Sequence, residues 1–210
     1  TAKPFALEED EPQRVAEAVR RMKLKHVVIT AVARDDLKDG GANHFARTIT
    51  AIREMDPKIV IEVLVPDFRG RMEVALDILE REPPDVFNHN LETVKRLQAE
   101  VRRGATYTRS LGLLAAAREL APSIPTKSGL MLGLGESKEE VIDTLKDLRH
   151  VDCQRITLGQ YLRPSLAHIP VARYWHPTEF AELGAIATDL GFTQVRSGPL
   201  VRSSYHAAGD

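Results

Sequence analysis

Short segments rich in polar and charged side chains recur in this sequence beside apolar runs, and they carry the residue types that bind ligands. They contain Asn, His, Lys, Gln, Arg and carboxylates, and they span 34–41, 66–70, 88–92, 126–136, 159–165 and 201–207. In parallel β/α folds, ligands bind beyond the carboxyl ends of the strands. Because these segments fall at or after predicted strands, we expect them to form one ligand-binding rim.

Some of these residues also have structural explanations, and the sequence leaves both open. The aspartates around Gly40 and Gly41 are typical of a turn that caps a helix. Ser137 could cap the next helix, and His89 could be a buried histidine with satisfied hydrogen bonds. Lys127 is harder to explain in this way, because a charge within a strand must face a ligand, a partner or water.

Two further patterns disfavour common cofactor sites. The glycines at 129, 133 and 135 match neither the dinucleotide pattern G-x-G-x-x-G nor a P-loop, so nucleotide-phosphate binding is disfavoured. Cys153 is the single cysteine, which excludes an intrachain disulfide and any Cys-only metal site within this chain. It lies at the start of a predicted strand among apolar residues and is therefore expected in the core.

The elements that must position these residues alternate between strands and helices. Strands are expected near 26–32, 59–65, 85–89, 126–132, 155–159 and 192–196, and helices near 11–22, 43–55, 71–81, 91–99, 108–120, 138–149 and 177–190. Asp10 is a candidate N-cap for the first helix. The alternation implies right-handed crossovers and a parallel sheet, either an α/β barrel or a doubly wound sheet.

Length and composition predict one domain over residues 1–210, with a C-terminal tail at about 198–210, and the alternation of elements makes it an α/β domain. The chain has 210 residues, 43% of them hydrophobic, and a formal charge of -1 from 29 basic and 30 acidic residues. This balance gives no global field for nucleic acid or an anionic membrane. No run approaches the roughly 18 apolar residues of a membrane span. The first eleven residues lack a signal layout, which favours a cytoplasmic or organelle-matrix protein.

The sequence resembles the lipoyl synthase family over residues 10–207. The strings that carry the resemblance are VVITAVARDDLKDGGANHF, IEVLVPDFRG, PDVFNHNLETV, IPTKSGLMLGLGE, TLGQYLRPS and SGPLVRSSYHA. The resemblance implies a radical S-adenosylmethionine (SAM) enzyme with a partial (β/α)6 barrel. Such an enzyme inserts two sulfur atoms into a protein-bound octanoyl chain to make the lipoyl cofactor.

The resemblance also implies cofactors and partners. One 4Fe-4S cluster cleaves SAM to the 5'-deoxyadenosyl radical, and a second, auxiliary 4Fe-4S cluster donates sulfur. The partners are octanoylated lipoyl carrier domains, namely dehydrogenase E2 subunits and the glycine cleavage H protein. The protein itself is expected to be a monomer.

Site residues follow from the same resemblance, position by position. For SAM binding it implies Gly40, Gly41, Asn90, Glu92, Lys127, Gly129, Gly133, Glu136 and Gln160. Gly40 and Gly41 would offer backbone carbonyls to the SAM ammonium, and Gly133 would let the backbone approach adenine. A serine of the C-terminal motif, Ser203 or Ser204, would ligate an iron of the auxiliary cluster, with Arg202 offsetting the cluster charge.

One departure from the family pattern leaves alternatives open. The C-x3-C-x2-C and C-x4-C-x5-C motifs that hold the two clusters are absent, and Cys153 alone cannot replace them. The simplest expectation is a fragment or truncated homologue that lacks the first barrel strand and is inactive alone. The alternatives are a non-catalytic module that binds the carrier, and a barrel lyase with Lys127 as a Schiff-base amine of lowered pKa.

Overall fold

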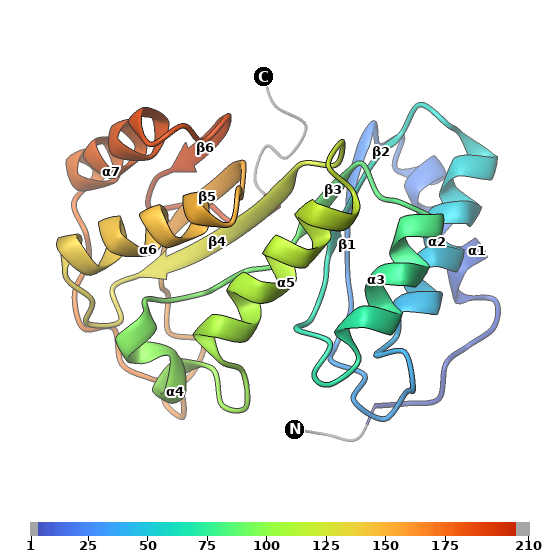
Figure 1. Ribbon diagram of the computed structural model, residues 1–210, viewed down its shortest axis with the longest axis horizontal. Coiled ribbons are helices and arrows are strands. Elements are labelled where there is room, and N and C mark those ends of the chain that lie inside the picture. The colour runs from blue at the N-terminus through green and yellow to red at the C-terminus, as the bar shows by residue number, and fades with distance from the viewer. Residues whose placement is uncertain (1–3, 205–210) are drawn as a thin grey trace. The chain divides into compact units, whose positions relative to one another are not determined.

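The computed structural model describes residues 4–204, which divide into two compact units (Figure 1). The first unit comprises residues 4–88 with 120–124, and the second comprises 89–119 with 125–204. The residues of the predicted tail beyond 204 lie outside the described part. Whether 1–210 act as a single domain stays a prediction, as does a barrel strand preceding this sequence.

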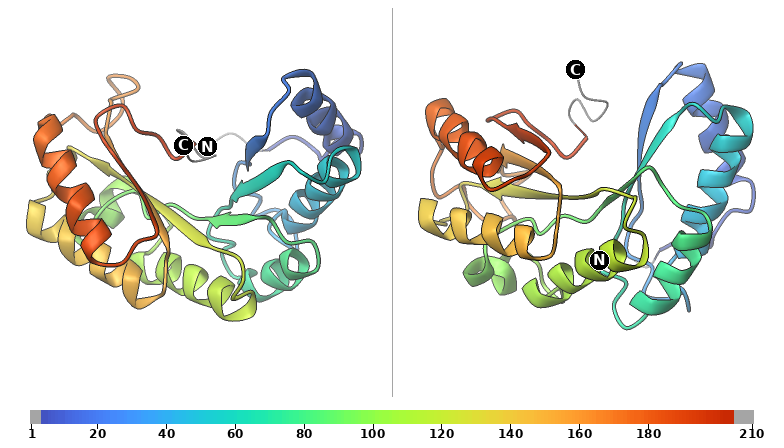
Figure 2. Two further views of the ribbon diagram at one scale, coloured as in Figure 1. Left: turned by 90° about the horizontal axis from the view of Figure 1, so that it is seen from above. Right: turned by 45° about the horizontal axis from the view of Figure 1, so that its top comes forward.

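Three parallel strands with helices on one face make up the first unit (Figure 2). The strands are β1 (His26–Thr30), β2 (Val60–Leu64) and β3 (Val86–Asn88), and the helices are α1 (Glu11–Arg21), α2 (Ala42–Met55) and α3 (Met72–Arg81). Ile49 and Ile52 of α2, with Ile61 of β2, have no exposed surface. Burying each such side chain stabilises the fold by about 1.5–3 kcal/mol.

The second unit repeats this arrangement with three more parallel strands. The strands are β4 (Thr126–Leu132), β5 (Arg155–Gln160) and β6 (Gln194–Ser197). The helices are the 3-10 turn η1 (Lys95–Leu97), α4 (Gln98–Val101), α5 (Tyr107–Leu120), α6 (Lys138–His150) and α7 (Pro177–Asp189). Helices lie on one face of these strands (Figure 2). None of the helices between residues 4 and 204 is long and apolar enough to cross a membrane.

The two faces of β4, β5 and β6 differ in polarity. Lys127 of β4 pairs in register with Arg155 of β5, which in turn pairs with Gln194 of β6, and Gly129 pairs with Thr157, which pairs with Arg196. Because side chains alternate along a strand, these residues share one face of the strands. The intervening residues Leu130, Ile156 and Leu158 are buried on the other face. The sequence thus folds into strands with a polar face, and most of the predicted site residues lie in this unit.

The strand and helix alternation predicted from the sequence is confirmed, with two local corrections. Residues 91–94 are not helical as predicted for 91–99, since Glu92 has φ +69 and pairs with β4, and only a short 3-10 turn and α4 follow. Asp10 makes no side-chain cap on α1. Its carboxylate instead lies 3.3 Å from the guanidinium of Arg14, one turn further along the helix.

The capping of α6 by Ser137 is confirmed and gives a pH-dependent contribution to stability. Ser137 and Glu140 form a capping box, and Arg96 binds the Glu140 carboxylate at 2.7 and 2.9 Å. Arg96 and the Ser137 N–H lower the pKa of Glu140 to about 2. The folded state therefore stabilises the ionised Glu140 carboxylate relative to the unfolded state.

Substituting Glu140→Gln is expected to lower the free energy of unfolding at neutral pH by about 1 kcal/mol, because solvent screens this partly exposed pair. Because the pKa of Glu140 is lower in the folded state than in the unfolded state, the contribution of its carboxylate to stability is fully present above the unfolded pKa. This contribution is lost as the pH falls from about 4.5 to about 2. Urea unfolding at several pH values measures this. An equal difference in the free energy of unfolding between parent and variant at pH 7 and at pH 2 would contradict the assignment of this pH dependence to Glu140.

Candidate functional site

The Gly40–Gly41 turn lies in the first unit, where Asp39 organises it. The Asp39 carboxylate accepts hydrogen bonds from Gly41 N at 3.0 Å and from Asn43 N at 2.9 Å, which caps the start of α2. Both glycines have positive φ, and a Cβ on Gly40 would lie 2.8 Å from the Phe68 ring. The Gly41 carbonyl accepts from two amides of α2. The structural explanation of this loop therefore holds, and its role toward SAM stays a prediction.

A buried carboxylate in the first unit was missed by the sequence reasoning. Glu62 of β2 has no exposed surface, and its Oε1 accepts a 2.7 Å hydrogen bond from Asn88 Nδ2. His26 Nε2 lies 3.7 Å from Glu62 Oε2. The available signal was an acid that interrupts the apolar run 59–65, since a buried carboxylate requires polar partners.

In the second unit, residues 89–92 run along β4. His89 N donates to Lys127 O at 3.0 Å, Glu92 N donates to Gly129 O at 2.9 Å, and Met131 N donates to Glu92 O at 2.8 Å. This pairing brings together four predicted site residues from two separate sequence segments: Asn90, Glu92, Lys127 and Gly129. His89 is buried and its ring contacts Ser110 Oγ at 2.9 Å, as the structural explanation predicted.

Asn90 and Glu92 provide oxygen acceptors beside Gly129. The Asn90 Oδ1 atom is buried without a hydrogen-bond partner within residues 4–204. A Cβ on Gly129 would lie 2.9 Å from that atom and 2.8 Å from Thr157 Oγ1, so a larger residue would have to displace these side chains. Burial raises the pKa of the Glu92 carboxyl, and its hydrogen bond with Asn90 opposes this shift in part. The pair suits a ligand that brings hydrogen-bond donors.

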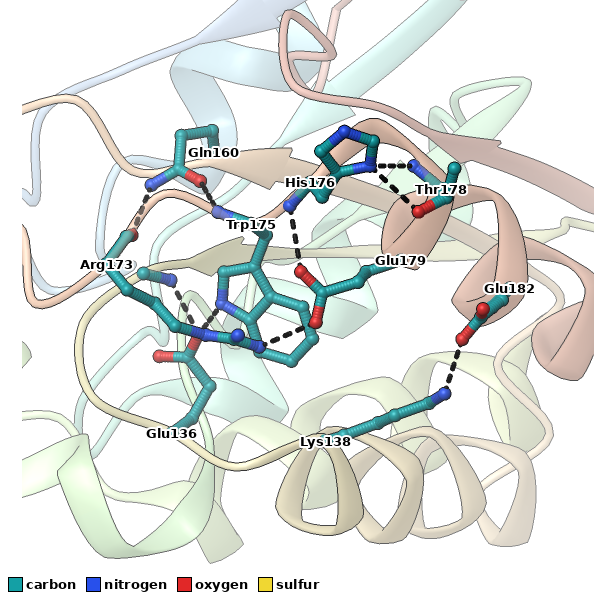
Figure 3. Close-up of polar contacts among 10 residues, drawn as sticks. Glu136, Lys138, Gln160, Arg173, Trp175, His176, Thr178, Glu179 and Glu182 are labelled. Carbon is teal, nitrogen blue, oxygen red and sulfur yellow. Dashed lines mark hydrogen bonds and ion pairs between the residues drawn. The ribbon is translucent and has the colours of Figure 1, made fainter.

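Glu136 occupies the turn after β4, where its carboxylate is enclosed by donors (Figure 3). Its Oε1 accepts from Gly133 N at 2.5 Å and from Trp175 Nε1 at 2.8 Å, and its Oε2 accepts from Leu134 N at 2.9 Å. Only 5% of Glu136 is exposed. The carboxylate therefore joins the end of β4 to the segment that precedes α7.

Gln160 reinforces the same connection from the end of β5 (Figure 3). Its Oε1 accepts from Trp175 N at 3.0 Å, and its Nε2 donates to Arg173 O at 3.2 Å. The Arg173 guanidinium lies 3.7 Å from the centre of the Trp175 ring. Trp175 was missed by the sequence reasoning, because it lies far along the chain from the residues it contacts.

Gly133 is surrounded by this network. It has φ +107, and a Cβ would lie 2.2 Å from Gln160 Nε2 and 2.5 Å from Arg173 O. These contacts require glycine whether or not adenine approaches. The SAM-binding roles of Gly133, Glu136 and Gln160 stay predictions, and each residue already has a structural partner.

The C-terminal motif is described as far as Ser204. The Ser203 carbonyl accepts a 2.6 Å hydrogen bond from Lys127 Nζ, and the Arg202 guanidinium donates to Val201 O at 2.7 Å. Ser203 is half-buried and Ser204 is exposed. The structure thus brings Ser203 to β4, and the assignment of Ser203 or Ser204 as an iron ligand stays a prediction.

The described residues do not fit a 4Fe-4S cluster. Cys153 is fully buried, and burial raises its thiol pKa to about 12, which confirms it as a core residue. Between residues 4 and 204 no group of three or more His, Cys, Asp or Glu side chains is arranged to hold a metal ion. A cluster needs several thiolate ligands, and this chain contributes one unreactive thiol. For SAM, Asn90 and Glu92 offer oxygen atoms of the kind that accept hydrogen bonds from ammonium and hydroxyl groups, and their SAM-binding roles stay predictions.

Comparisons with solved structures confirm the fold class. SuiB from Streptococcus suis bound to S-adenosylmethionine gives a TM-score of 0.66 at 13% identity, covering 90% of this chain and 42% of that one. Methylornithine synthase (PylB) also gives 0.66 at 13% identity, covering 97% of this chain and 66% of that one. At such low identity, these likenesses establish the partial-barrel fold alone.

Sequence comparisons identify the family. A model of the radical SAM superfamily matches residues 1–148. Lipoyl synthase 2 of Parasynechococcus marenigrum (strain WH8102) is 67% identical over 98% of this chain and 72% of its own length. Lipoyl synthase 2 of Prochlorococcus marinus (strain MIT 9313) is 63% identical over 97% of this chain and 70% of its own length. Lipoyl synthase of Hahella chejuensis is 60% identical over 98% of this chain and 62% of its own length. The chain therefore belongs to the lipoyl synthase family of the radical SAM superfamily.

Proposed function

We propose that this chain is the barrel portion of a lipoyl synthase, which inserts two sulfur atoms into a protein-bound octanoyl group. The observation that carries the proposal is its identity of 67% and 63% to two lipoyl synthases over nearly its whole length. The chain spans 62–72% of the lengths of the relatives reported above. The whole reaction is accordingly assigned to a longer protein or assembly.

In this proposal, residues of the second unit contribute to SAM binding. Asn90 and Glu92 offer acceptors to the donors of the ligand, beside the restricted space at Gly129. SAM supplies a 5'-deoxyadenosyl radical to enzymes of this superfamily. The protein's own task is to hold the nucleoside and the acyl chain in a fixed geometry and to exclude water.

The cluster ligands are assigned largely to residues outside these 210. The chain's own contribution is a serine oxygen from Ser203 or Ser204, with Arg202 nearby. An oxygen ligand is harder than a thiolate and holds iron less firmly, so it suits a cluster that must give up sulfur. Octanoylated lipoyl carrier proteins are the proposed partners, among them dehydrogenase E2 subunits and the glycine cleavage H protein. We place the protein in the cytoplasm or an organelle matrix.

The Schiff-base lyase alternative finds little support in the geometry. Lys127 is 4% exposed and its Nζ donates to the Ser203 carbonyl, so the amine is engaged and shielded from a carbonyl substrate. The non-catalytic alternative, a module that binds the carrier, is favoured by one observation. Cys153 is the single cysteine of the sequence and is buried.

Ser203→Ala is expected to separate the two stages of the proposed reaction. The test requires a chimera that joins this chain to the residues of the Parasynechococcus relative that it does not match. In that chimera, Ser203→Ala should retain SAM cleavage and lose at least about tenfold in lipoyl formation, because it removes only the serine oxygen. Mass spectrometry of the carrier and chromatography of 5'-deoxyadenosine measure the two stages. Parental lipoyl formation by both Ser203→Ala and Ser204→Ala would refute the ligand assignment.

A further inference from the structure

The segment 198–204 lies against β5 and β4 through contacts at both of its ends. Gly198 N donates to Leu158 O at 3.0 Å, and Gln160 N donates to Pro199 O at 3.3 Å. A Cβ on Gly159 would lie 2.2 Å from Val201 O, so the absence of a side chain there lets the segment cross β5 closely. We call residues 198–204 the C-terminal strap.

Lys127 provides the contact at the far end of the strap. Its side chain is 4% exposed, and its Nζ donates a 2.6 Å hydrogen bond to the Ser203 carbonyl. A hydrogen bond from a charged donor is about twice as strong as a neutral one. Burying an ammonium group in a strand costs free energy unless hydrogen-bond partners compensate for the lost water. The Ser203 carbonyl is one such partner.

We propose that Lys127 is a positioning residue that fixes the backbone at Ser203, and with it the direction of the Ser203 hydroxyl. This inference rests on the proposed function, in which a serine of this motif binds iron. It assigns to Lys127 a role distinct from SAM binding. Because a carbonyl and the hydroxyl of the same residue are separated by few bonds, fixing the carbonyl restricts the hydroxyl. The 202–204 segment has no regular secondary structure to hold it otherwise.

The test measures strap mobility in the 210-residue chain, without clusters or SAM. A nitroxide is attached to Ser204→Cys, whose position is exposed, while Cys153 stays unlabelled because it is buried with a thiol pKa of about 12. Adding Lys127→Met should raise the equilibrium ratio of open to closed strap at least about tenfold, seen as a larger mobile component in the electron paramagnetic resonance spectrum. Lys127→Arg should restore most of the immobile component, because it keeps a charged donor.

Controls separate this role from a general loss of structure. Lys146→Met removes a lysine on an exposed helix surface and should leave the spectrum unchanged. A label at Glu119→Cys on α5 should be insensitive to Lys127→Met. If Lys127→Met unfolds the chain, Gly159→Ala provides a second route, since its Cβ displaces Val201 and should mobilise the same label. An immobile label in every folded variant of Lys127 and Gly159 would overturn the proposal.

The chimera then connects strap position to the reaction. Lys127→Met should reduce lipoyl formation at least about tenfold while SAM cleavage continues, which reproduces Ser203→Ala, and Lys127→Arg should restore part of the product. Equal loss of both stages would instead indicate a role in SAM binding and would overturn the inference. If Lys127→Met makes the strap mobile but Ser203→Ala leaves the chimera fully active, Lys127 still holds the strap and the assignment of Ser203 as an iron ligand is refuted.

Discussion

Replacing Gly133 with valine is expected to lower the free energy of unfolding by about 4 kcal/mol. A β-branched residue at φ +107 costs about 1–3 kcal/mol, and forcing a side chain into a packed region costs a similar amount. The Cβ would meet Gln160 Nε2 and the Arg173 carbonyl, and the carbonyl cannot move without moving the segment before α7. Urea unfolding followed by circular dichroism measures the change.

Gly112→Ala is the matched control for this prediction. Gly112 lies within α5, and a Cβ there has no atom within 4 Å, so alanine should stabilise the helix by up to about 1 kcal/mol. Superimposable unfolding curves for Gly133→Val and the parent would show that the crowding does not exist in solution. A loss of SAM binding by Gly133→Val would have to be corrected for this destabilisation before adenine contact is inferred.

Glu136→Ala is expected to destabilise the protein by about 4 kcal/mol. The variant leaves the Gly133 N–H, the Leu134 N–H and the Trp175 indole N–H without their acceptor, and each unsatisfied buried donor costs about 1–3 kcal/mol. Glu136→Gln keeps one oxygen and should cost about half as much. Glu119→Gln, at an exposed position, should change stability by less than about 0.5 kcal/mol.

Trp175 gives this prediction an independent spectroscopic measurement, because it is the single tryptophan of the chain. In the parent it is 3% exposed and hydrogen-bonded to Glu136. Loss of the acceptor should admit water, so the fluorescence emission of folded Glu136→Ala should shift to longer wavelength. An unchanged emission together with unchanged stability would mean that the Glu136 carboxylate does not hold the indole.

The strands and helices could be predicted from the sequence because their signals are local. β4 was predicted at its observed bounds, Thr126–Leu132, which lie between Pro125 and Gly133. The helix predicted at 91–99 was wrong because local periodicity does not register pairing with a distant strand. Glu92 adopts a left-handed backbone conformation and bonds to Gly129 and Met131 of β4. Tertiary hydrogen bonding therefore overrode helix propensity there.

The candidate site was predictable in its residue types but not in its contacts. Lys127, Glu136 and Gln160 stood out as polar residues within or just after predicted strands, and all three are buried. Their partners lie far along the chain: Ser203 for Lys127, and Trp175 for the other two. Such pairings depend on the register of β4 and β5 and on the path of the connecting segments, which no local pattern encodes.

The most direct test of the central claim is lipoyl formation by the chimera of this chain with the unmatched residues of the Parasynechococcus relative. The chimera is reconstituted anaerobically with iron and sulfide, supplied with SAM and a reductant, and given an octanoylated carrier domain. We predict that mass spectrometry will detect a carrier in which two sulfur atoms have been added to the octanoyl group. A folded chimera that holds both clusters and cleaves SAM, yet leaves the octanoyl group without sulfur, would contradict the account.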